Sequence, residues 1–166
     1  MKKEVEKILQ YVQKPARYAG GELNSVVEDK KQGGLRYAFC FPDTYEIGMS
    51  HLGMKILYGL VNERTDAWCE RVFAPDTDME EQMRKHGVPL FALESGDYLT
   101  DFDMIGFTLQ YELSYTNVLN MLDLAHIPLK SCERTELTPI VAFGGPCTCN
   151  PVSYTHLRAH ETPEHL

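Results

Sequence analysis

Residues 35–58, LRYAFCFPDTYEIGMSHLGMKILY, decide the fold. They begin with a short apolar run rich in aromatic residues, 35–42, which predicts a buried strand. A polar loop follows at 43–50, and residues 51–62 then place Leu52, Ile56, Leu57 and Leu60 on one face of a predicted helix. A buried strand, a polar loop and a helix in this order are typical of a parallel α/β sheet.

The same alternation continues along the chain. Further strands are predicted at 67–73, 88–93, 104–109 and 139–143, and further helices at 3–13, 76–85 and 113–125. Asp76 or Thr77 is suited to cap the helix at 76–85. The pattern predicts a three-layer, Rossmann-like α/β domain, in which helices cover both faces of a doubly wound parallel sheet.

Composition limits the classes of protein that the chain can belong to. It has 166 residues, a formal charge of −8, 43% hydrophobic residues and five cysteines. An acidic chain has no general attraction for nucleic acid or anionic lipid, and no apolar run approaches the roughly 20 residues that span a bilayer. The odd number of cysteines, without a repeating framework, favours reduced thiols in the cytoplasm.

We divide the chain into an N-terminal helix and loop (1–34), an α/β domain that is incomplete at its C-terminus (35–151) and a tail (152–166). The tail has no strand or core-helix pattern and resembles a translated sequencing adapter, so we exclude it from the fold prediction. His156 and His160 have the spacing of two metal ligands on a helix, with His165 nearby. Because all three lie in the tail, we predict no metal site from them.

Ligands of doubly wound sheets bind beyond the carboxyl ends of the strands, so the loops there hold the candidate site residues. Asp43 and Glu46 could act as acid–base groups, or Asp43 could only hold its own loop. Gly48 allows the backbone to approach a ligand closely. Ser50 could contact a ligand, although capping the next helix is its expected role.

The loop at 144–150, GGPCTCN, contains a second group of candidates. Gly144 and Gly145 permit close approach of a bulky ligand, or they form an ordinary turn. Cys147 and Cys149 supply two thiols, which do not complete a zinc or iron–sulfur site, so we interpret them as packing residues. The sequence contains no GxGxxG, Walker or GxSxG motif.

Four blocks of the sequence together resemble one known family. The blocks FCFPDTYEIGMSHLGMKILY, DMEEQMR, IGFTLQYELSYTNVLNML and IVAFGGPCTCNP are similar to the N-terminal part of a family of cobalamin-binding-domain radical SAM proteins. The resemblance implies a cobalamin-binding-like domain over about 18–151. It also implies a downstream radical SAM domain as partner, which would carry a [4Fe-4S] cluster and S-adenosylmethionine.

The resemblance assigns cofactor-binding roles to particular residues. The general cobalamin-binding pattern is Asp-x-His-x-x-Gly, a Ser-x-Leu-like element and a Gly-Gly pair. Asp43 and Gly48 match the first element, Thr108 stands loosely at the serine of the second, and the pair is at 144–145. The resemblance also implies that the hydroxyl of Ser50 lines the same pocket.

Tyr45 occupies the position of the histidine that normally binds cobalt. A phenol is a poorer neutral donor and stays protonated at pH 7. Either cobalamin binds without a histidine ligand, or the site has lost cobalamin.

The five cysteines lack the Cys-x-x-x-Cys-x-x-Cys spacing of a radical SAM cluster, so we do not expect this chain to catalyse that reaction alone. The leading prediction is a corrinoid-holding domain from a radical SAM protein. The alternatives are a scaffold that docks the radical SAM domain without a cofactor, and a flavodoxin-like nucleotide binder. The absence of a phosphate-cradling loop disfavours the nucleotide binder.

Overall fold

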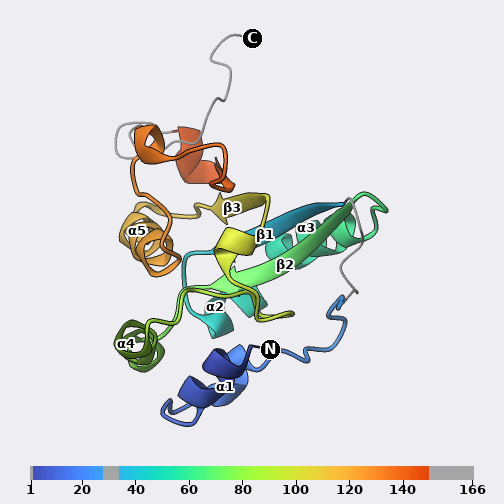
Figure 1. Ribbon diagram of the computed structural model, residues 1–166. Helices are drawn as coiled ribbons and strands as arrows, with labels where there is room; N and C mark the ends of the chain where they lie inside the picture. Colours follow the sequence, from blue (N-terminus) through green and yellow to red (C-terminus); the bar gives the residue numbers. More distant parts are fainter. Residues whose placement is uncertain (1, 28–33, 150–166) are drawn as a thin grey trace.

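A computed structural model describes residues 2–27 and 34–149 of the chain (Figure 1). The tail at 152–166, with its three histidines, lies outside these residues. The sheet consists of β1 (Leu35–Phe41), β2 (Ala67–Phe73), β3 (Met104–Thr108) and β4 (Ile140–Gly144). Its order is β2-β1-β3-β4 and every pair is parallel. The prediction of a doubly wound parallel α/β fold is therefore confirmed.

Helices lie on both faces of this sheet, which gives three layers (Figure 1). The side chains of α2 (Tyr45–Ser50) and α3 (Leu52–Asn62) pack on one face. Those of α4 (Thr77–His86) and α5 (Tyr115–Leu124) pack on the other, together with α1 (Lys3–Leu9). Five 3-10 turns complete the described elements: Pro15–Tyr18, Leu99–Asp101, Glu112–Ser114, Ser131–Glu133 and Pro146–Cys149.

The continuous apolar run of β1 serves two separate cores. Ala38 and Cys40 belong to the cluster under α4 and α5, whereas Phe39 and Phe41 belong to the cluster under α2 and α3. Successive side chains of a strand point to opposite faces, so a strand with helices on both sides is apolar at nearly every position, and in β1 only Arg36 departs from this. This explains why the sequence lacks the polar–apolar alternation of a half-exposed strand.

The strand predicted at 88–93 is wrong. Its only bridge among the described residues is an isolated antiparallel one from Phe91 to Tyr98. The Leu90 N–H donates to the carbonyl of Leu124 at 3.0 Å, and the Leu93 N–H donates to that of Arg71 at 2.8 Å. The segment is a buried connection that crosses the core, and a short buried apolar run has the same pattern whether or not it joins a sheet.

The helix ends agree with the sequence at one position and differ at another. Asp76 caps α4, as predicted, by accepting from the N–H of Thr77. Ser50 does not cap α3, because α2 runs through the predicted loop and includes Ser50 as its last residue. His51 takes that role, with its Nδ1 accepting from the Met54 N–H at 3.1 Å.

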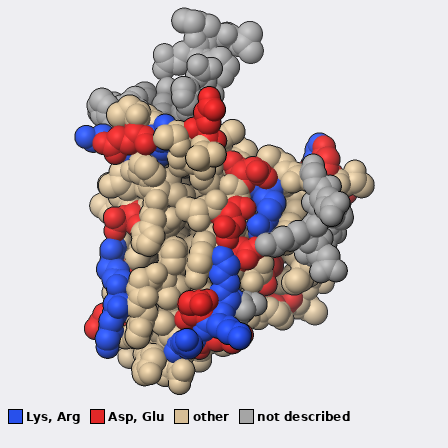
Figure 2. Space-filling model, viewed as in Figure 1, with Lys and Arg blue, Asp and Glu red and all other residues tan. Residues whose placement is uncertain are grey.

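The N-terminal segment is attached to the α/β domain by packing and by charge. Val5 and Ile8 of α1, which is shorter than the predicted helix, are fully buried in the core under α4 and α5. The Arg17 guanidinium donates to Glu46 at 2.7 Å and also pairs with Asp76, so it joins the starts of α2 and α4. On the face of the molecule that Figure 2 shows, acidic and basic side chains are intermixed rather than gathered by sign.

Candidate functional site

The strand order reverses between β1 and β3. From β1 the chain continues to β2 on one side of β1, whereas β3 pairs with β1 on its other side. A crevice at such a switch point is the usual ligand position in doubly wound sheets. Here the loops after the two strands are joined by a hydrogen bond from the Tyr111 hydroxyl to the Asp43 carboxylate. The Asn117 side-chain amide adds a second link, donating to the carbonyl of Pro42 at 2.9 Å.

Asp43 connects three strand-end loops. Its Oδ1 accepts from the Thr44 N–H at 2.7 Å, and its backbone carbonyl accepts from the Ala74 N–H, after β2, at 3.0 Å. The bond to the carboxylate raises the pKa of Tyr111, because the phenol loses a favourable hydrogen bond when it ionises. The geometry supports the loop-holding interpretation of Asp43.

Tyr45 is directed toward the N-terminal segment. Its hydroxyl donates to Glu22 Oε1 at 2.5 Å, and its ring packs edge-on against Phe73, with centroids 5.6 Å apart. Burial, together with the bond to Glu22, raises the pKa of Tyr45 to about 12. The side chain is therefore a neutral phenol whose hydroxyl hydrogen is already donated to Glu22.

Gly48 and Ser50 have local partners in α2. A Cβ at Gly48 would lie 2.3 Å from the Phe73 ring, so glycine lets α2 pack closely against the end of β2. The Ser50 hydroxyl donates to the carbonyl of Glu46 at 2.6 Å and is exposed. Among the described residues, neither is part of the lining of the groove described next.

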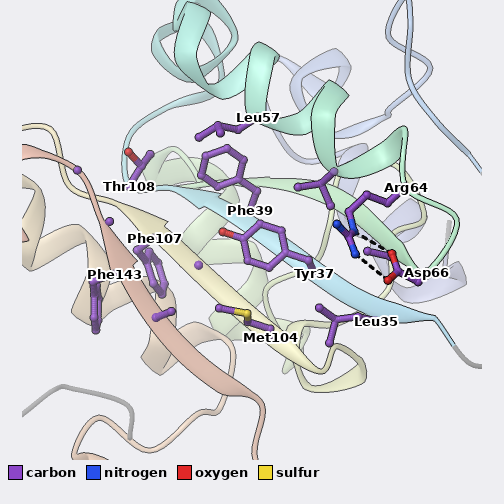
Figure 3. A pocket seen from close by; sticks show the side chains of 16 residues that line it. Leu35, Tyr37, Phe39, Leu57, Arg64, Asp66, Met104, Phe107, Thr108 and Phe143 are labelled. Atoms are coloured by element: carbon purple, nitrogen blue, oxygen red, sulfur yellow. Dashed lines mark hydrogen bonds and ion pairs between the residues drawn. The ribbon is translucent and has the colours of Figure 1, made fainter. Parts of the chain in front are cut away.

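A groove of about 550 Å³ runs along the sheet between α3 and strands β1, β3 and β4 (Figure 3). Figure 3 shows Tyr37 and Phe39 of β1 beside Leu57 of α3, while Thr108 marks the carboxyl end of β3. Pockets for small molecules are usually about 300–1,000 Å³ and mostly apolar. The lining residues are Leu35, Tyr37, Phe39, Leu57, Val61, Arg64, Asp66, Ala67, Met104, Gly106, Phe107, Thr108, Ala142, Phe143, Gly144 and Gly145.

Small residues make the floor of this groove. Gly106, Ala142 and Gly144 lie on the two strands that α3 leaves uncovered. The Tyr37 ring extends across β3, and a Cβ at Gly106 would be 1.9 Å from its hydroxyl. Burial raises the pKa of Tyr37 above its ordinary value. Thr108 supplies a polar group at the carboxyl end, where its Oγ1 accepts from Gln110 Nε2 at 2.6 Å.

The two adjacent glycines have different surroundings. Gly145 has φ +101°, and a Cβ there would be 2.6 Å from the carbonyl oxygen of Leu109. Gly144 has open space on the side where its Cβ would be. Its carbonyl accepts from the Leu109 N–H at 2.7 Å, which holds the ends of β3 and β4 together.

The predicted site residues therefore fall into two groups at the carboxyl edge of the sheet. Thr108 is paired in register with Gly144, and Gly145 adjoins them. Asp43, Tyr45, Gly48 and Ser50 lie after β1, and the contacts of Tyr45 and Gly48 are toward the end of β2.

Sequence reasoning did not select Tyr37 or Gly106 for the site. A glycine within an apolar strand is a known signal of close approach by another group, so Gly106 could have been found. The position of Tyr37 across the neighbouring strand gives no comparable signal.

Metal-binding clusters and membrane spans are absent from the part of the chain that the structure describes. Within residues 2–27 and 34–149, no three His, Cys, Asp or Glu side chains gather where they could hold a metal ion. Cys40, Cys69, Cys132 and Cys147 are free thiols. No helix in the same ranges has the length and apolar character needed to cross a membrane.

The fold places the chain among doubly wound α/β domains, and its groove runs along one face of the sheet as far as the carboxyl ends of β3 and β4. Residues 53–157 match the family described as radical SAM proteins, N-terminal region. The match covers more than half of the chain, so this chain belongs to that family. It begins within α3 and takes in β2, β3 and β4. No match was found among curated proteins or among solved structures.

Proposed function

We propose that this N-terminal region holds a corrinoid for its radical SAM protein, with the nucleotide tail of the corrinoid in the groove beside α3. The observation that carries the proposal is the position of the groove. It reaches the ends of β3 and β4, where Thr108, Gly144 and Gly145 line it. These are the residues that stand at the second and third elements of the cobalamin-binding pattern.

The lining fits a flat aromatic base. Tyr37 and Phe39 offer aromatic surface on one side, with the Tyr37 ring lying over Gly106 of β3, and Gly144 leaves open space at the end of β4. Aromatic rings pair favourably when they are stacked with an offset or edge to face. The Thr108 hydroxyl can exchange its bond from Gln110 for one to a polar group of the tail.

A bound corrinoid would supply cobalt-centred chemistry, and the chain's own residues would orient it and exclude water. Gly144 gives clearance for the tail, and Gly145 keeps the end of β4 close to Leu109. The bond between Tyr111 and Asp43 holds the two loops at the switch point in fixed positions.

Tyr45, which stands where the cobalamin-binding pattern has its axial histidine, does not fit the role of a cobalt ligand. The phenol of Tyr45 is bonded to Glu22 and has a pKa of about 12, so it is a poor ligand at neutral pH. We therefore propose that the cobalt receives no side-chain ligand from this position.

The proposal assigns the [4Fe-4S] cluster and S-adenosylmethionine to the radical SAM region that follows in this family. Three thiolates are needed to leave one iron open for S-adenosylmethionine, and residues 2–27 and 34–149 contain no such cluster of ligands. The N-terminal region is then a cofactor carrier rather than a complete enzyme.

A binding experiment with the purified chain and hydroxocobalamin tests the proposal. We expect the corrinoid to be retained through gel filtration, with a changed visible spectrum and a Kd below about 100 μM. Gly144→Leu places a side chain in the groove and should abolish retention. Gly59→Leu, on α3 and also facing open space, should leave it unchanged. Retention that is equal in the two variants, or absent from the wild type, contradicts the proposal.

The second candidate function is a scaffold without cofactor. It is favoured by the hydroxyl of Tyr45, which is already bonded to Glu22, and by the apolar residues exposed on α3. It predicts that a full-length protein of the family works equally well in cells grown without cobalamin. A loss of function in that medium would exclude the scaffold role.

A further inference from the structure

A second cavity, of about 610 Å³, lies on the same face of the sheet as the groove, but at the edge formed by β2. Its walls are the N-terminal segment at 22–26, the end of α2, one side of α3 and the side chain of Arg71. Within the described residues, the cavity and the groove have no lining residue in common. The cavity is lined by Glu22, Leu23, Asn24, Val26, Met49, Lys55, Tyr58, Gly59, Asn62, Glu63 and Arg71.

Arg71 is the buried charged residue of this cavity, with a side chain that is 5% exposed. Its Nε donates to Glu94 Oε1 at 2.6 Å, and one terminal nitrogen donates to Ser25 Oγ at 3.0 Å. The other terminal nitrogen has only the sulfur of Met49 as acceptor, at 3.3 Å. A thioether is a weak acceptor. Because Arg71 and Met49 both line the cavity, a ligand there can offer this nitrogen a better acceptor.

Tyr58 and Ser25 add two hydroxyl groups beside the guanidinium. Arg71 lies over the Tyr58 ring, 4.5 Å from its centroid, and the Tyr58 hydroxyl accepts from the Val26 N–H at 2.7 Å. Burial raises the pKa of Tyr58 to about 12, so the phenol keeps its hydrogen at neutral pH. In the part of the chain that the structure describes, neither hydroxyl has an acceptor for its own hydrogen. Since buried donors normally have acceptors, this group of donors indicates a ligand with acceptor oxygens.

A turn in the N-terminal segment holds these groups in position. The Ser25 N–H donates to the carbonyl of Glu22 at 3.0 Å, and Asn24 has φ +65°, a conformation that asparagine adopts more readily than most residues. The turn leaves Leu23 at the mouth of the cavity, where it is 91% exposed. The segment is therefore one wall of a cavity as well as a connection between α1 and the sheet.

The charges of the lining limit what the cavity can bind. Arg71 and Lys55 are positive and Glu22 and Glu63 are negative, and Glu94 pairs with Arg71 from outside the lining. A simple anion would therefore meet no net positive charge, whereas a ligand that carries both signs can satisfy both kinds of group. The lining also has apolar side chains for the remainder of such a ligand: Leu23, Val26 and Met49.

We propose that this cavity binds a free α-amino acid with an apolar side chain. The carboxylate accepts from the terminal nitrogen of Arg71 that now contacts sulfur and from the hydroxyl of Tyr58, because guanidinium–carboxylate hydrogen bonds are among the strongest in proteins. The ammonium group pairs with the carboxylates of the lining, and the side chain packs against its apolar residues. The site requires no corrinoid and is independent of the proposed function.

L-Leucine and two analogues test the proposal with the unaltered chain. Isothermal titration should give a Kd below about 1 mM for leucine. The analogue 3-methylbutylamine lacks the carboxylate and 4-methylpentanoate lacks the ammonium group, so each should bind at least about tenfold more weakly. Absence of leucine binding at about 10 mM, or equal binding of either analogue, would overturn the proposal.

A substitution at Gly59 tests the location of the site. A Cβ at Gly59 meets nothing within 4 Å, so Gly59→Leu fills the cavity without a clash and should weaken leucine binding at least about tenfold. Leu60→Phe is the matched control, because it adds bulk at the next position of α3, where the side chain is exposed. It should bind leucine as the wild type does. Equal affinity of Gly59→Leu and the wild type would overturn the proposal.

Amide NMR shifts of the wild-type chain separate this site from the groove. Leucine should shift the amides of 22–26 and 55–63 and leave those of 104–108 unchanged. Shifts confined to 104–108 and 140–145 would place leucine in the groove and overturn the proposal. A chain that binds leucine in the expected position but retains no hydroxocobalamin would contradict the corrinoid proposal alone, so the two failures are distinguishable.

Discussion

The adjacent glycines at the end of β4 offer a sharp test of the structure, because the same substitution should destabilise the fold at one position and leave it nearly unchanged at the other. In Gly145→Ala the new Cβ would lie 2.6 Å from the carbonyl oxygen of Leu109 and 3.0 Å from its nitrogen. Both are backbone atoms, so no side-chain rotation relieves the clash. The residue also has φ +101°, where side chains are strained.

The cost can be estimated from these two effects. A residue other than glycine in such a backbone region costs about 1–3 kcal/mol, and forced overpacking costs a similar amount. Because movement of the loop relieves part of both, we expect Gly145→Ala to lower the free energy of unfolding by about 2–4 kcal/mol. Gly144→Ala meets nothing within 4 Å and should change it by less than about 0.5 kcal/mol.

Urea unfolding followed by the fluorescence of Trp68, the single and buried tryptophan, measures both changes. The slope of the transition should be the same in both variants, so the midpoints report stability. If Gly145→Ala unfolds within about 0.5 kcal/mol of the wild type, or if the two variants are equally destabilised, the assigned roles of the two glycines are wrong.

Three further changes test other contacts. In the structure the guanidinium of the buried Arg71 lies 2.6 Å from the Glu94 carboxylate. Glu94→Gln removes this ionic partner and should lower the free energy of unfolding, measured in urea, by about 3–5 kcal/mol. His51→Ala removes the acceptor at the start of α3 and should cost about 1 kcal/mol in the same measurement, whereas His51→Asn should restore most of it. The hydrogen bond from Arg17 lowers the pKa of Asp76, so this pair stabilises the fold above the ordinary aspartate pKa of about 3.9 and ceases to do so as the pH falls further. Arg17→Met should therefore reduce stability by up to about 1 kcal/mol at pH 7 and have a smaller effect at pH 3, as thermal unfolding at the two pH values would show.

The four strands could be placed from the sequence because each is a mostly apolar run that ends in a loop, although β2 contains the buried charged residues Glu70 and Arg71. The run at 88–93 has the same composition, yet its backbone bonds go to Arg71 and Leu124, in separate elements. Whether such a run joins the sheet depends on whether an edge strand of the sheet has unpaired backbone groups next to it in the folded structure. A local pattern contains no information about that edge.

The candidate site was predicted in part. The Gly-Gly pair was selected from its place after a predicted strand and Thr108 from the family resemblance, and all three line one groove in the structure. Tyr37 was not selected, because its approach to Gly106 depends on the pairing of β1 with β3, nearly seventy positions apart in the chain.

The sequence alone determined the parallel α/β class and the order of most elements, apart from the segment at 88–93 and α2, since both follow from local periodicity and from the residues that end each run. The resemblance to radical SAM proteins also lay in the sequence, in four separate blocks. Only the tertiary structure decided that the apolar face of α3 formed by Leu52, Ile56 and Leu60 points away from the sheet, and that the hydroxyl of Tyr45 bonds to Glu22. These features depend on contacts between distant segments, which are fixed when the layers pack and leave no local pattern in the chain.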